Sequence, residues 1–327
     1  SAASDVYKRQ TMGRVALPEL RRMGYSGSLS TGALAAGGTL GILIPPSVIL
    51  IIYSILTEQN IAKMFLAAFV PGILAAIGYL IAIAIFVRIK PDSGPPTSYV
   101  GWRQRLNLFG QVWQILVIFF LVIGGIYLGW FTPTEGASIG AAGTGIMALF
   151  TKGFNFSDLI DVIKDTAVTS AMIFLVLLGA EFFNSFIALT QITNELATFV
   201  ISNELSPYLV VFCILVLYIL LGCLMDSLAM ILLTIPVFFP IIIELDFGMS
   251  IEEVAIWFGI LTLIVVEVGL ITPPVGLNVF IINKMAKNVP ISDTFIGVLP
   301  FLISDLIRVG ILFIFPGISL FLIRLFG

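Results

Sequence analysis

The sequence predicts an all-α polytopic membrane protein in which two helices are broken at membrane depth. Three observations support this fold class. The 327-residue chain is 59% hydrophobic and only 11% charged, about half the charged fraction of soluble domains. Its apolar stretches reach the roughly 20 residues that a spanning helix needs. Two of these stretches carry a matching motif, Gly41-Ile-Leu-Ile-Pro-Pro-Ser47 and Gly269-Leu-Ile-Thr-Pro-Pro-Val275.

The apolar stretches, taken in order, predict the elements. We expect a broken helix over 27–57, spans over 64–87, 112–130, 134–150 and 166–190, a re-entrant hairpin over 207–243, a second broken helix over 251–288 and a last span over 293–323. Residues 91–110 form a polar connection and then a short amphipathic stretch, and 193–206 are amphipathic and suit the membrane interface. The hairpin is interrupted near Asp226, its expected tip, and again at Pro236 and Pro240.

Several function classes are excluded by composition. The chain contains no histidine, which removes His-based catalysis, haem ligation by His and the usual zinc sites. No nucleophile–base pair supports an intramembrane enzyme, so we predict that the protein is not an enzyme. There is no long basic run, which argues against a nucleic-acid partner. Cys213 and Cys223 lie in apolar sequence and read as packing residues.

Each Pro-Pro pair predicts exposed main-chain oxygens. Proline has no N–H and crowds the carbonyl four residues back, so the first pair frees the carbonyls of Gly41 and Ile42 and the second those of Gly269 and Leu270. Unpaired backbone is tolerated at membrane depth only where it lines a cavity or meets an ion. Freed carbonyls are hard oxygen ligands that suit Na⁺, and the half-helix that follows offers a positive N-terminus to a carboxylate. The alternative is a proline kink in a packing helix.

Polar side chains near the breaks extend this prediction. Thr39, Ser47 and Asn278 are candidates for substrate binding, and Thr272 adds an oxygen at the second break. Asp226 is either a functional carboxylate at membrane depth or an N-cap of the second hairpin arm. We favour a structural role for Glu267, just before the second break. Thr132-Pro-Thr-Glu135 is a capping box with proline at the first helical position, so Glu135 is also structural.

The distribution of charge predicts an inverted-topology repeat. One threading places these basic residues of short loops in the cytoplasm: Arg21, Arg22, Arg88, Lys90, Arg103, Arg105, Lys152, Lys164, Lys284 and Lys287. Glu58 and the acidic stretch Glu244–Glu253 then fall outside, and the two broken helices run in opposite directions. The flanks also match, since Met23-Gly-Tyr-Ser26 precedes the first copy and Phe247-Gly-Met-Ser250 the second. Broken helices at corresponding places of two halves point to a transporter's binding site.

Taken together, these motifs resemble those of a known family: the large membrane subunit, of the dicarboxylate type, of tripartite ATP-independent periplasmic (TRAP) transporters. The resemblance runs from about Thr11 to the C-terminus and rests on Gly37-Gly-Thr-Leu-Gly-Ile-Leu-Ile-Pro-Pro-Ser47, Leu56-Thr-Glu58, Gly129-Trp-Phe-Thr-Pro-Thr-Glu135, Leu221-Gly-Cys-Leu-Met-Asp226 and Glu267-Val-Gly-Leu-Ile-Thr-Pro-Pro-Val-Gly-Leu-Asn278.

The resemblance implies an elevator-type transporter of the ion-transporter superfamily in the bacterial inner membrane. It implies uptake of a small carboxylate delivered by a periplasmic binding protein, coupled to Na⁺ and needing no other cofactor, with a small four-helix membrane subunit as a further partner besides the lipid bilayer. Carried over to this chain, the first Na⁺ site takes Gly41, Ile44 and Pro46. By repeat symmetry the second takes Gly269, Thr272 and Pro274 with the hairpin tip from Gly222 to Asp226.

The resemblance also implies a division of the chain. Residues 1–90 and 207–327 would form the two halves of a moving transport domain, and 91–206 the scaffold and interfacial arms. The family has a small-residue hairpin tip upstream of Thr11, where this chain has Asp5, Tyr7, Lys8 and Arg9. We therefore expect a fragment whose upstream helices are missing, with a first cation site that is incomplete or an N-terminus that is not native. The rival function is a channel-like passive pore without a coupling ion.

Overall fold

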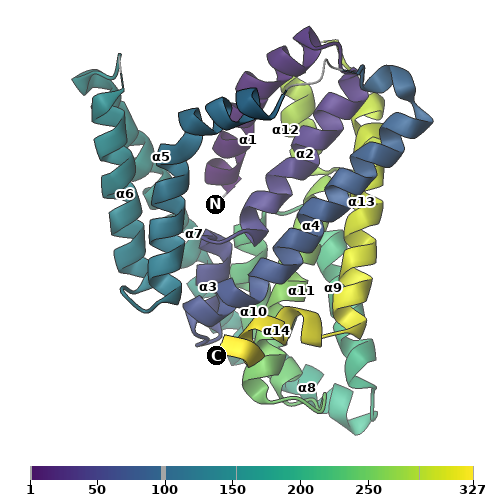
Figure 1. The fold of residues 1–327 in the computed structure, drawn as a ribbon. Coiled ribbons are helices and arrows are strands. Elements are labelled where there is room, and N and C mark those ends of the chain that lie inside the picture. The colour runs from purple at the N-terminus through teal and green to yellow at the C-terminus, as the bar shows by residue number, and fades with distance from the viewer. Residues whose placement is uncertain (1, 97–100, 152, 287, 327) are drawn as a thin grey trace. The chain divides into compact units, whose positions relative to one another are not determined.

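The computed structural model describes residues 2–96, 101–151, 153–286 and 288–326, and the side chains of these except 2–11, 103–109 and 111–112. Every long element in these ranges is a helix (Figure 1). The helices are α1 (Ala2–Arg22), α2 (Gly27–Leu43), α3 (Val48–Leu56), α4 (Ile61–Ile89), α5 (Trp102–Tyr127), α6 (Pro133–Phe150), α7 (Phe156–Thr190), α8 (Ile192–Ser202), α9 (Pro207–Gly222), α10 (Ser227–Ile243), α11 (Ile251–Ile271), α12 (Leu277–Met285), α13 (Ile291–Ile314) and α14 (Gly317–Phe326), with a 3-10 turn η1 at Pro91–Ser93.

The lengths of these helices confirm an all-α polytopic membrane protein. Among the described residues, α4, α7, α11 and α13 are each long and apolar enough to cross a membrane, and the bent pair α2–α3 would make a fifth span. The chain divides into two compact units, residues 96–171 and the rest. In the smaller unit α5 and α6 pack as a helical hairpin. Helix α6 begins with the predicted capping box, in which Glu135 Oε2 accepts from the N–H of Thr132 at 2.8 Å.

The larger unit is built around α11. Every residue of this helix from Val254 to Ile271 is buried, as expected of a helix that is apolar on all sides. Helices α2, α3, α9, α10 and α13 pack around it. The Trp257 ring is fully buried against Tyr208, Phe247 and Phe313, and its Nε1 donates to the carbonyl of Leu312 at 2.8 Å.

The two broken helices lie side by side and run in opposite directions. At one end Ala35 of α2 shares a buried cluster with Ile271 of α11 and Val279 of α12. At the other end the Tyr53 hydroxyl of α3 donates to the carbonyl of Ala255 at 2.6 Å. Numbering thus rises along α2–α3 while it falls along α11, which is the antiparallel arrangement predicted from the charges.

A second close approach fixes α13 against α2. A Cβ atom on Gly32 would collide with the backbone of Gly297, so only paired glycines let these helices meet. Nearby, Ser28 Oγ donates to the carbonyl of Asp293 at 2.7 Å, and Thr31 Oγ1 donates to Thr294 Oγ1 at 3.0 Å. The start of α13 is therefore held to the start of α2 by polar as well as packing contacts.

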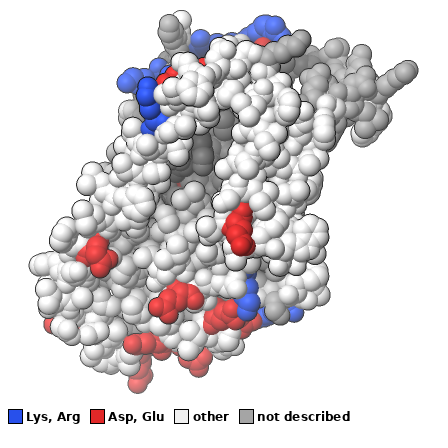
Figure 2. Space-filling model, turned by 90° about the vertical axis from the view of Figure 1, so that its left-hand side faces the viewer, with Lys and Arg blue, Asp and Glu red and all other residues white. Residues whose placement is uncertain are grey.

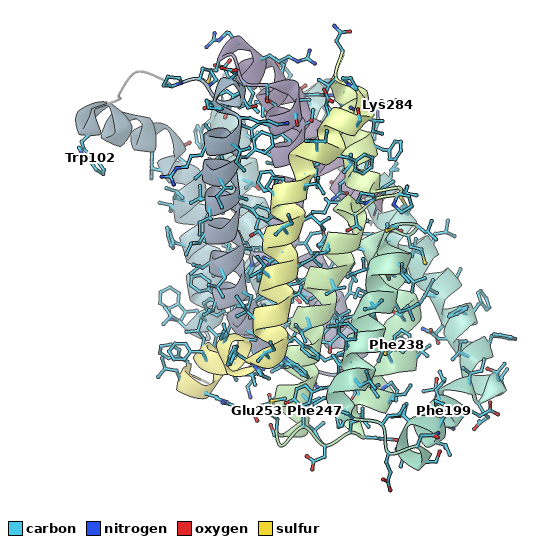
Figure 3. All side chains as sticks on the ribbon, turned by 90° about the vertical axis from the view of Figure 1, so that its right-hand side faces the viewer. Trp102, Phe199, Phe238, Phe247, Glu253 and Lys284 are labelled. Carbon is cyan, nitrogen blue, oxygen red and sulfur yellow. The ribbon has the colours of Figure 1, made fainter. Side chains whose placement is uncertain are left out.

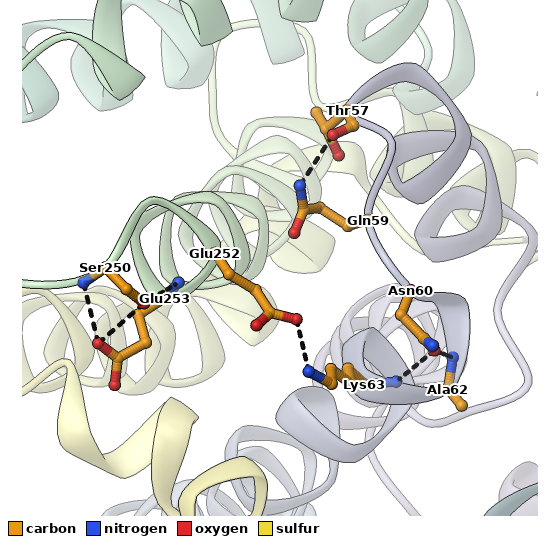
Figure 4. Close-up of polar contacts among 8 residues, drawn as sticks. All are labelled: Thr57, Gln59, Asn60, Ala62, Lys63, Ser250, Glu252 and Glu253. Atoms are coloured by element: carbon orange, nitrogen blue, oxygen red, sulfur yellow. Dashed lines mark hydrogen bonds and ion pairs between the residues drawn. The ribbon is translucent and has the colours of Figure 1, made fainter. Parts of the chain in front are cut away.

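Opposite charges mark the two ends of the larger unit. Lys284 lies at one end and Glu253 at the other (Figure 3). On the face drawn in Figure 2, Lys and Arg gather mostly toward one end and Asp and Glu toward the other. At the acidic end Asn60 caps α4, Ser250 and Glu253 cap α11, and Lys63 Nζ pairs with Glu252 at 2.7 Å (Figure 4). Side chains that the orientation and N-terminal predictions used but that lie outside the described part are Asp5, Tyr7, Lys8, Arg9, Arg103, Arg105, Lys152 and Lys287.

Four predicted boundaries are wrong. Helix α5 begins at Trp102 rather than 112 and helix α7 at Phe156 rather than 166, because in each case the more polar residues before the apolar stretch continue the helix. Helix α10 continues through Pro236 and Pro240 instead of being interrupted there. The carbonyl that Pro236 deprives of a helical partner belongs to Leu232, and it accepts from the Asn184 amide of α7 at 3.4 Å. The last span ends at Ile314 rather than continuing to 323, because Pro316 separates α13 from the short helix α14.

Candidate functional site

The first break separates α2 from α3 at residues 44–47. The helix pair bends by 44° there, and Ile44 and Ser47 have extended backbone. The Ile44 N–H still bonds to the carbonyl of Leu40 at 3.1 Å, which ends the first half-helix. Ser47 begins the second as its N-cap, with Oγ accepting from the N–H of Leu50 at 3.4 Å. Gly41, Ile44 and Pro46 are exposed, so the predicted ligand carbonyls lie on an open part of the unit.

The second break separates α11 from α12 at residues 272–276. Thr272 has extended backbone and ends α11, and Gly276 starts α12 at φ +59°, ψ 71°, a left-handed conformation that glycine adopts at no steric cost. Both breaks contain a cis Pro-Pro peptide bond. Thr272 Oγ1 donates to the carbonyl of Val268 at 2.6 Å, which leaves its lone pairs available. The two predicted breaks are therefore real interruptions and not continuous bent helices.

The hairpin tip between α9 and α10 lies directly on the second break. A Cβ atom on Gly222 would come within 2.8 Å of the Gly269 Cα atom, so the two backbones touch. The Cys223 thiol lies 3.3 Å from the carbonyl of Ile219 and 3.6 and 3.7 Å from the carbonyls of Thr272 and Pro273, and its single proton can serve only one of the three. Three of the predicted cation-site residues, Gly222, Gly269 and Thr272, thus come together, while Pro274 is exposed on the following turn.

Cys223 lies at the site although its sequence context suggested packing alone. The thiol is a weak donor, and the two break carbonyls near it, those of Thr272 and Pro273, are not the ones that the second Pro-Pro pair frees. Of the carbonyls four residues before the prolines, that of Gly269 is not free as predicted, because it accepts from the N–H of Thr272 at 3.1 Å. The position of Cys223 in the predicted tip motif was a usable signal. Because cysteine is commonly a small buried residue, its apolar context alone favoured packing.

Asp226 caps the second arm of the hairpin, as one of its two interpretations predicted. Its Oδ2 accepts from the N–H of Ala229 at 3.3 Å, and its backbone is extended. The side chain is partly exposed at the tip. Glu267 is 1% exposed within α11, two residues before Gly269. Capping does not decide whether Asp226 also meets a cation, so that part stays a prediction.

The three predicted substrate residues have different surroundings. Thr39 and Ser47 are buried. Thr39 Oγ1 lies 2.7 Å from the carbonyl of Ala36 and 2.9 Å from the Tyr79 hydroxyl, and its one proton is shared between these two acceptors. Asn278 is 0% exposed, and neither its amide nitrogen nor its amide oxygen has a hydrogen-bond partner among the described residues. A buried amide without partners costs about 1–3 kcal/mol, so Asn278, alone among the three, has donor and acceptor groups available for a ligand.

A buried polar network was missed by sequence reasoning. The Tyr79 hydroxyl of α4 donates to Asp305 Oδ2 of α13 at 2.7 Å, and Arg308 Nη2 donates to Asp305 Oδ1 at 2.8 Å. Through Thr39 the network reaches the first broken helix. An Asp and an Arg three residues apart inside a predicted span were a signal for it, because ionisable groups at membrane depth are rare and pair with one another.

Antiparallel broken helices in a polytopic all-helical chain define a membrane protein of the transporter class. The chain belongs to the family described as "Tripartite ATP-independent periplasmic transporter, DctM component", which matches residues 1–318. The resemblance predicted from the motifs is thereby confirmed.

Relatives of the chain carry different substrate names. The chain is 32% identical to the C4-dicarboxylate TRAP transporter large permease protein DctM of Pseudomonas aeruginosa, over 94% of this chain and 70% of the relative. It is 30% identical to the sialic acid TRAP transporter permease protein SiaT of Haemophilus influenzae, over 95% of this chain and 49% of the relative. It is 27% identical to the isethionate TRAP transporter permease protein DctMQ of Oleidesulfovibrio alaskensis, over 95% of this chain and 48% of the relative. These relatives are transport proteins, which confirms that the chain is not an enzyme.

Proposed function

We propose that this chain is the part of a Na⁺-coupled secondary active transporter that moves a small organic anion inward across the bacterial inner membrane. The observation that carries the proposal is the second break with the hairpin tip seated on it, Gly222 against Gly269 and Cys223 on the carbonyls of Thr272 and Pro273. Hard carbonyl oxygens gathered at membrane depth are ligands for an alkali cation and not for lipid.

The anion end of the site is proposed on two features. Helices α3 and α12 each restart after a break, so each directs a helix N-terminus into the unit, and that end favours negative charge. Asn278 follows the first residue of α12 and has both amide atoms without partners among the described residues. A carboxylate or sulfonate oxygen accepting from the Asn278 amide would complete this end of the site, and Ser47 at the first break is a second candidate donor.

The names of the relatives are consistent with this substrate class. C4-dicarboxylate, sialic acid and isethionate all carry an acidic group that is ionised at neutral pH. We assign the chain no single substrate. In the proposed assembly a periplasmic binding protein delivers the anion and a small membrane subunit joins the scaffold. Residues 1–90 and 207–327 act as the moving domain of an elevator, with 91–206 as scaffold and arms.

Uptake by the reconstituted complex tests the proposal. Proteoliposomes holding the complete complex, that is, the whole large subunit containing this chain together with the small membrane subunit, receive a labelled C4-dicarboxylate and the binding protein, under an inward Na⁺ gradient or under equal Na⁺ on both sides. We expect accumulation above the external concentration only with the gradient. Uptake that stops when the internal and external anion concentrations are equal, with or without the Na⁺ gradient, would instead identify a passive pore. Uptake that depends only on a proton gradient would identify the proton, and not Na⁺, as the coupling ion.

A further inference from the structure

The end of α2, just before the first break, is weak as a helix. Gly37, Gly38 and Gly41 surround Thr39 there, and glycine is less favourable in a helix interior than any residue except proline. Close packing does not explain all three glycines, because a Cβ atom on Gly37 or Gly41 would meet open space. This part of α2 therefore depends on contacts from other elements to keep its shape.

Thr39 receives such a contact from α4 and, through it, from α13. Helices α2, α4 and α13 pack against one another (Figure 1). The Thr39 hydroxyl lies 2.9 Å from the hydroxyl of Tyr79, which donates to Asp305 at 2.7 Å. Arg308 donates to the second oxygen of the same carboxylate at 2.8 Å. All four residues are at most 5% exposed, so water competes little for these hydrogen bonds.

Two features make this chain of hydrogen bonds a firm attachment. The bond from Tyr79 to the carboxylate is charge-assisted, and such bonds are roughly twice as strong as neutral ones. The Tyr79 ring is itself held in place, because it packs edge-on against Phe301 of α13 with 5.1 Å between the ring centroids. Both rings belong to a buried cluster with Ala36 of α2. The Tyr79 hydroxyl thus has a defined position next to Thr39.

We propose that Tyr79 is a positioning residue for the first break: through Thr39 it fixes the end of α2 and so holds the main-chain oxygens of the break in place for a cation. The predicted ligands Gly41, Ile44 and Pro46 begin two residues after Thr39. Oxygens that are already ordered spare a cation the entropy cost of ordering them. Thr39 then serves the site by anchoring the backbone, without touching the anion. This inference rests on the proposed Na⁺ coupling.

Four substitutions test the anchor. Tyr79→Phe removes the hydroxyl and keeps the ring. Tyr218→Phe is its matched control, because Tyr218 is also fully buried and its hydroxyl bonds to that of Thr234 at 2.6 Å within the α9–α10 hairpin. Thr39→Val removes the anchoring bond from its other side, and Thr39→Ser retains it. Uptake by the complete complex at graded Na⁺ gives the half-maximal Na⁺ concentration and the maximal rate separately.

We expect Tyr79→Phe and Thr39→Val each to raise the half-maximal Na⁺ concentration about fivefold, as for the loss of one buried hydrogen bond, with the maximal rate unchanged. The double variant should be no worse than either single one, because both remove the same bond. Thr39→Ser and Tyr218→Phe should keep the wild-type Na⁺ dependence. An equal rise in Tyr218→Phe, effects that multiply in the double variant, or no rise in either single variant would each overturn the proposal.

Hydrogen–deuterium exchange of the same complex without Na⁺ separates this inference from the proposed coupling. We expect the peptide covering residues 40–51 to exchange faster in Tyr79→Phe than in the wild type or in Tyr218→Phe. Equal exchange in the three proteins would overturn the anchor, whichever ion drives transport. Wild-type uptake that ignores Na⁺ would instead overturn the coupling, and the exchange comparison would still decide whether Tyr79 holds the end of α2.

Discussion

At the residue scale, Thr272 separates an ion-binding role from a folding role. Its hydroxyl donates to the carbonyl of Val268, so the oxygen lone pairs remain available to a cation at the second break. We expect Thr272→Ala to raise the Na⁺ concentration for half-maximal uptake about tenfold, equivalent to about 1.4 kcal/mol, with Thr272→Ser close to wild type. Uptake at graded Na⁺ in proteoliposomes measures this. An unchanged Na⁺ dependence in the alanine variant, at normal expression, contradicts the assignment.

Asp226 has two roles that a pair of substitutions can divide. Asn caps helices as well as Asp, whereas Ala loses the cap at a cost of about 1 kcal/mol. Because Asp226 accepts from the N–H of Ala229, we expect Asp226→Asn to unfold at the wild-type temperature and Asp226→Ala to unfold earlier. If the carboxylate also meets Na⁺, Asp226→Asn alone weakens Na⁺-dependent uptake. Wild-type uptake by Asp226→Asn would assign the residue to capping only.

At the scale of elements, the contact between the hairpin and the second break depends on glycine. A methyl group on Gly222 would press on the backbone of Gly269, whereas Gly310 of α13 has open space around the same position. We expect Gly222→Ala to destabilise the protein by about 1–3 kcal/mol, the usual cost of overpacking, and to impair uptake. Gly310→Ala should be neutral or slightly stabilising, since alanine is favoured over glycine within a helix. Thermal unfolding of both purified variants gives the comparison, and equal melting temperatures would refute the close contact.

Asp305 and Arg308 form a buried ion pair within α13, and Asp305 also accepts from Tyr79 of α4. Removing one partner of a buried ion pair costs about 3–5 kcal/mol because the other charge is left uncompensated, whereas replacing both by apolar residues is often close to neutral. We expect Asp305→Leu to be far less stable than the double variant Asp305→Leu/Arg308→Leu. Thermal unfolding in one detergent measures the order. A double variant less stable than both single variants would mean that the pair acts through contacts with further residues.

Local chemistry explains which parts of this fold were predictable. The Pro-Pro pairs and the Thr132–Glu135 capping box act within one turn of chain, so sequence reasoning placed them correctly. Pro236 failed as an interruption because Asn184, on another helix, accommodates the carbonyl that it frees. The link from Tyr79 to Asp305 was missed for the same reason, since the two residues are 226 positions apart in the chain. Predicted roles for Gly41, Thr39 and Asn278 remain predictions because a ligand decides them.

At the scale of the whole molecule, the separation of charge predicts orientation. Lys284 and the acidic segment that contains Asp246 lie at opposite ends of the larger unit, and lysine and arginine are retained on the cytoplasmic side. In a background of Cys213→Ala/Cys223→Ala, we expect Asp246→Cys to react with a membrane-impermeant maleimide in spheroplasts and Lys284→Cys to react only after the membrane is permeabilised. Asp246 precedes α11 and Lys284 lies in the last turn of α12, so the two sites flank one broken helix and opposite accessibility also shows that this helix crosses the membrane completely. Reaction of both cysteines from the same side would mean that the chain returns at the break to the side of the membrane from which it entered. The two broken helices could then not form a site that opens alternately to the two sides of the membrane.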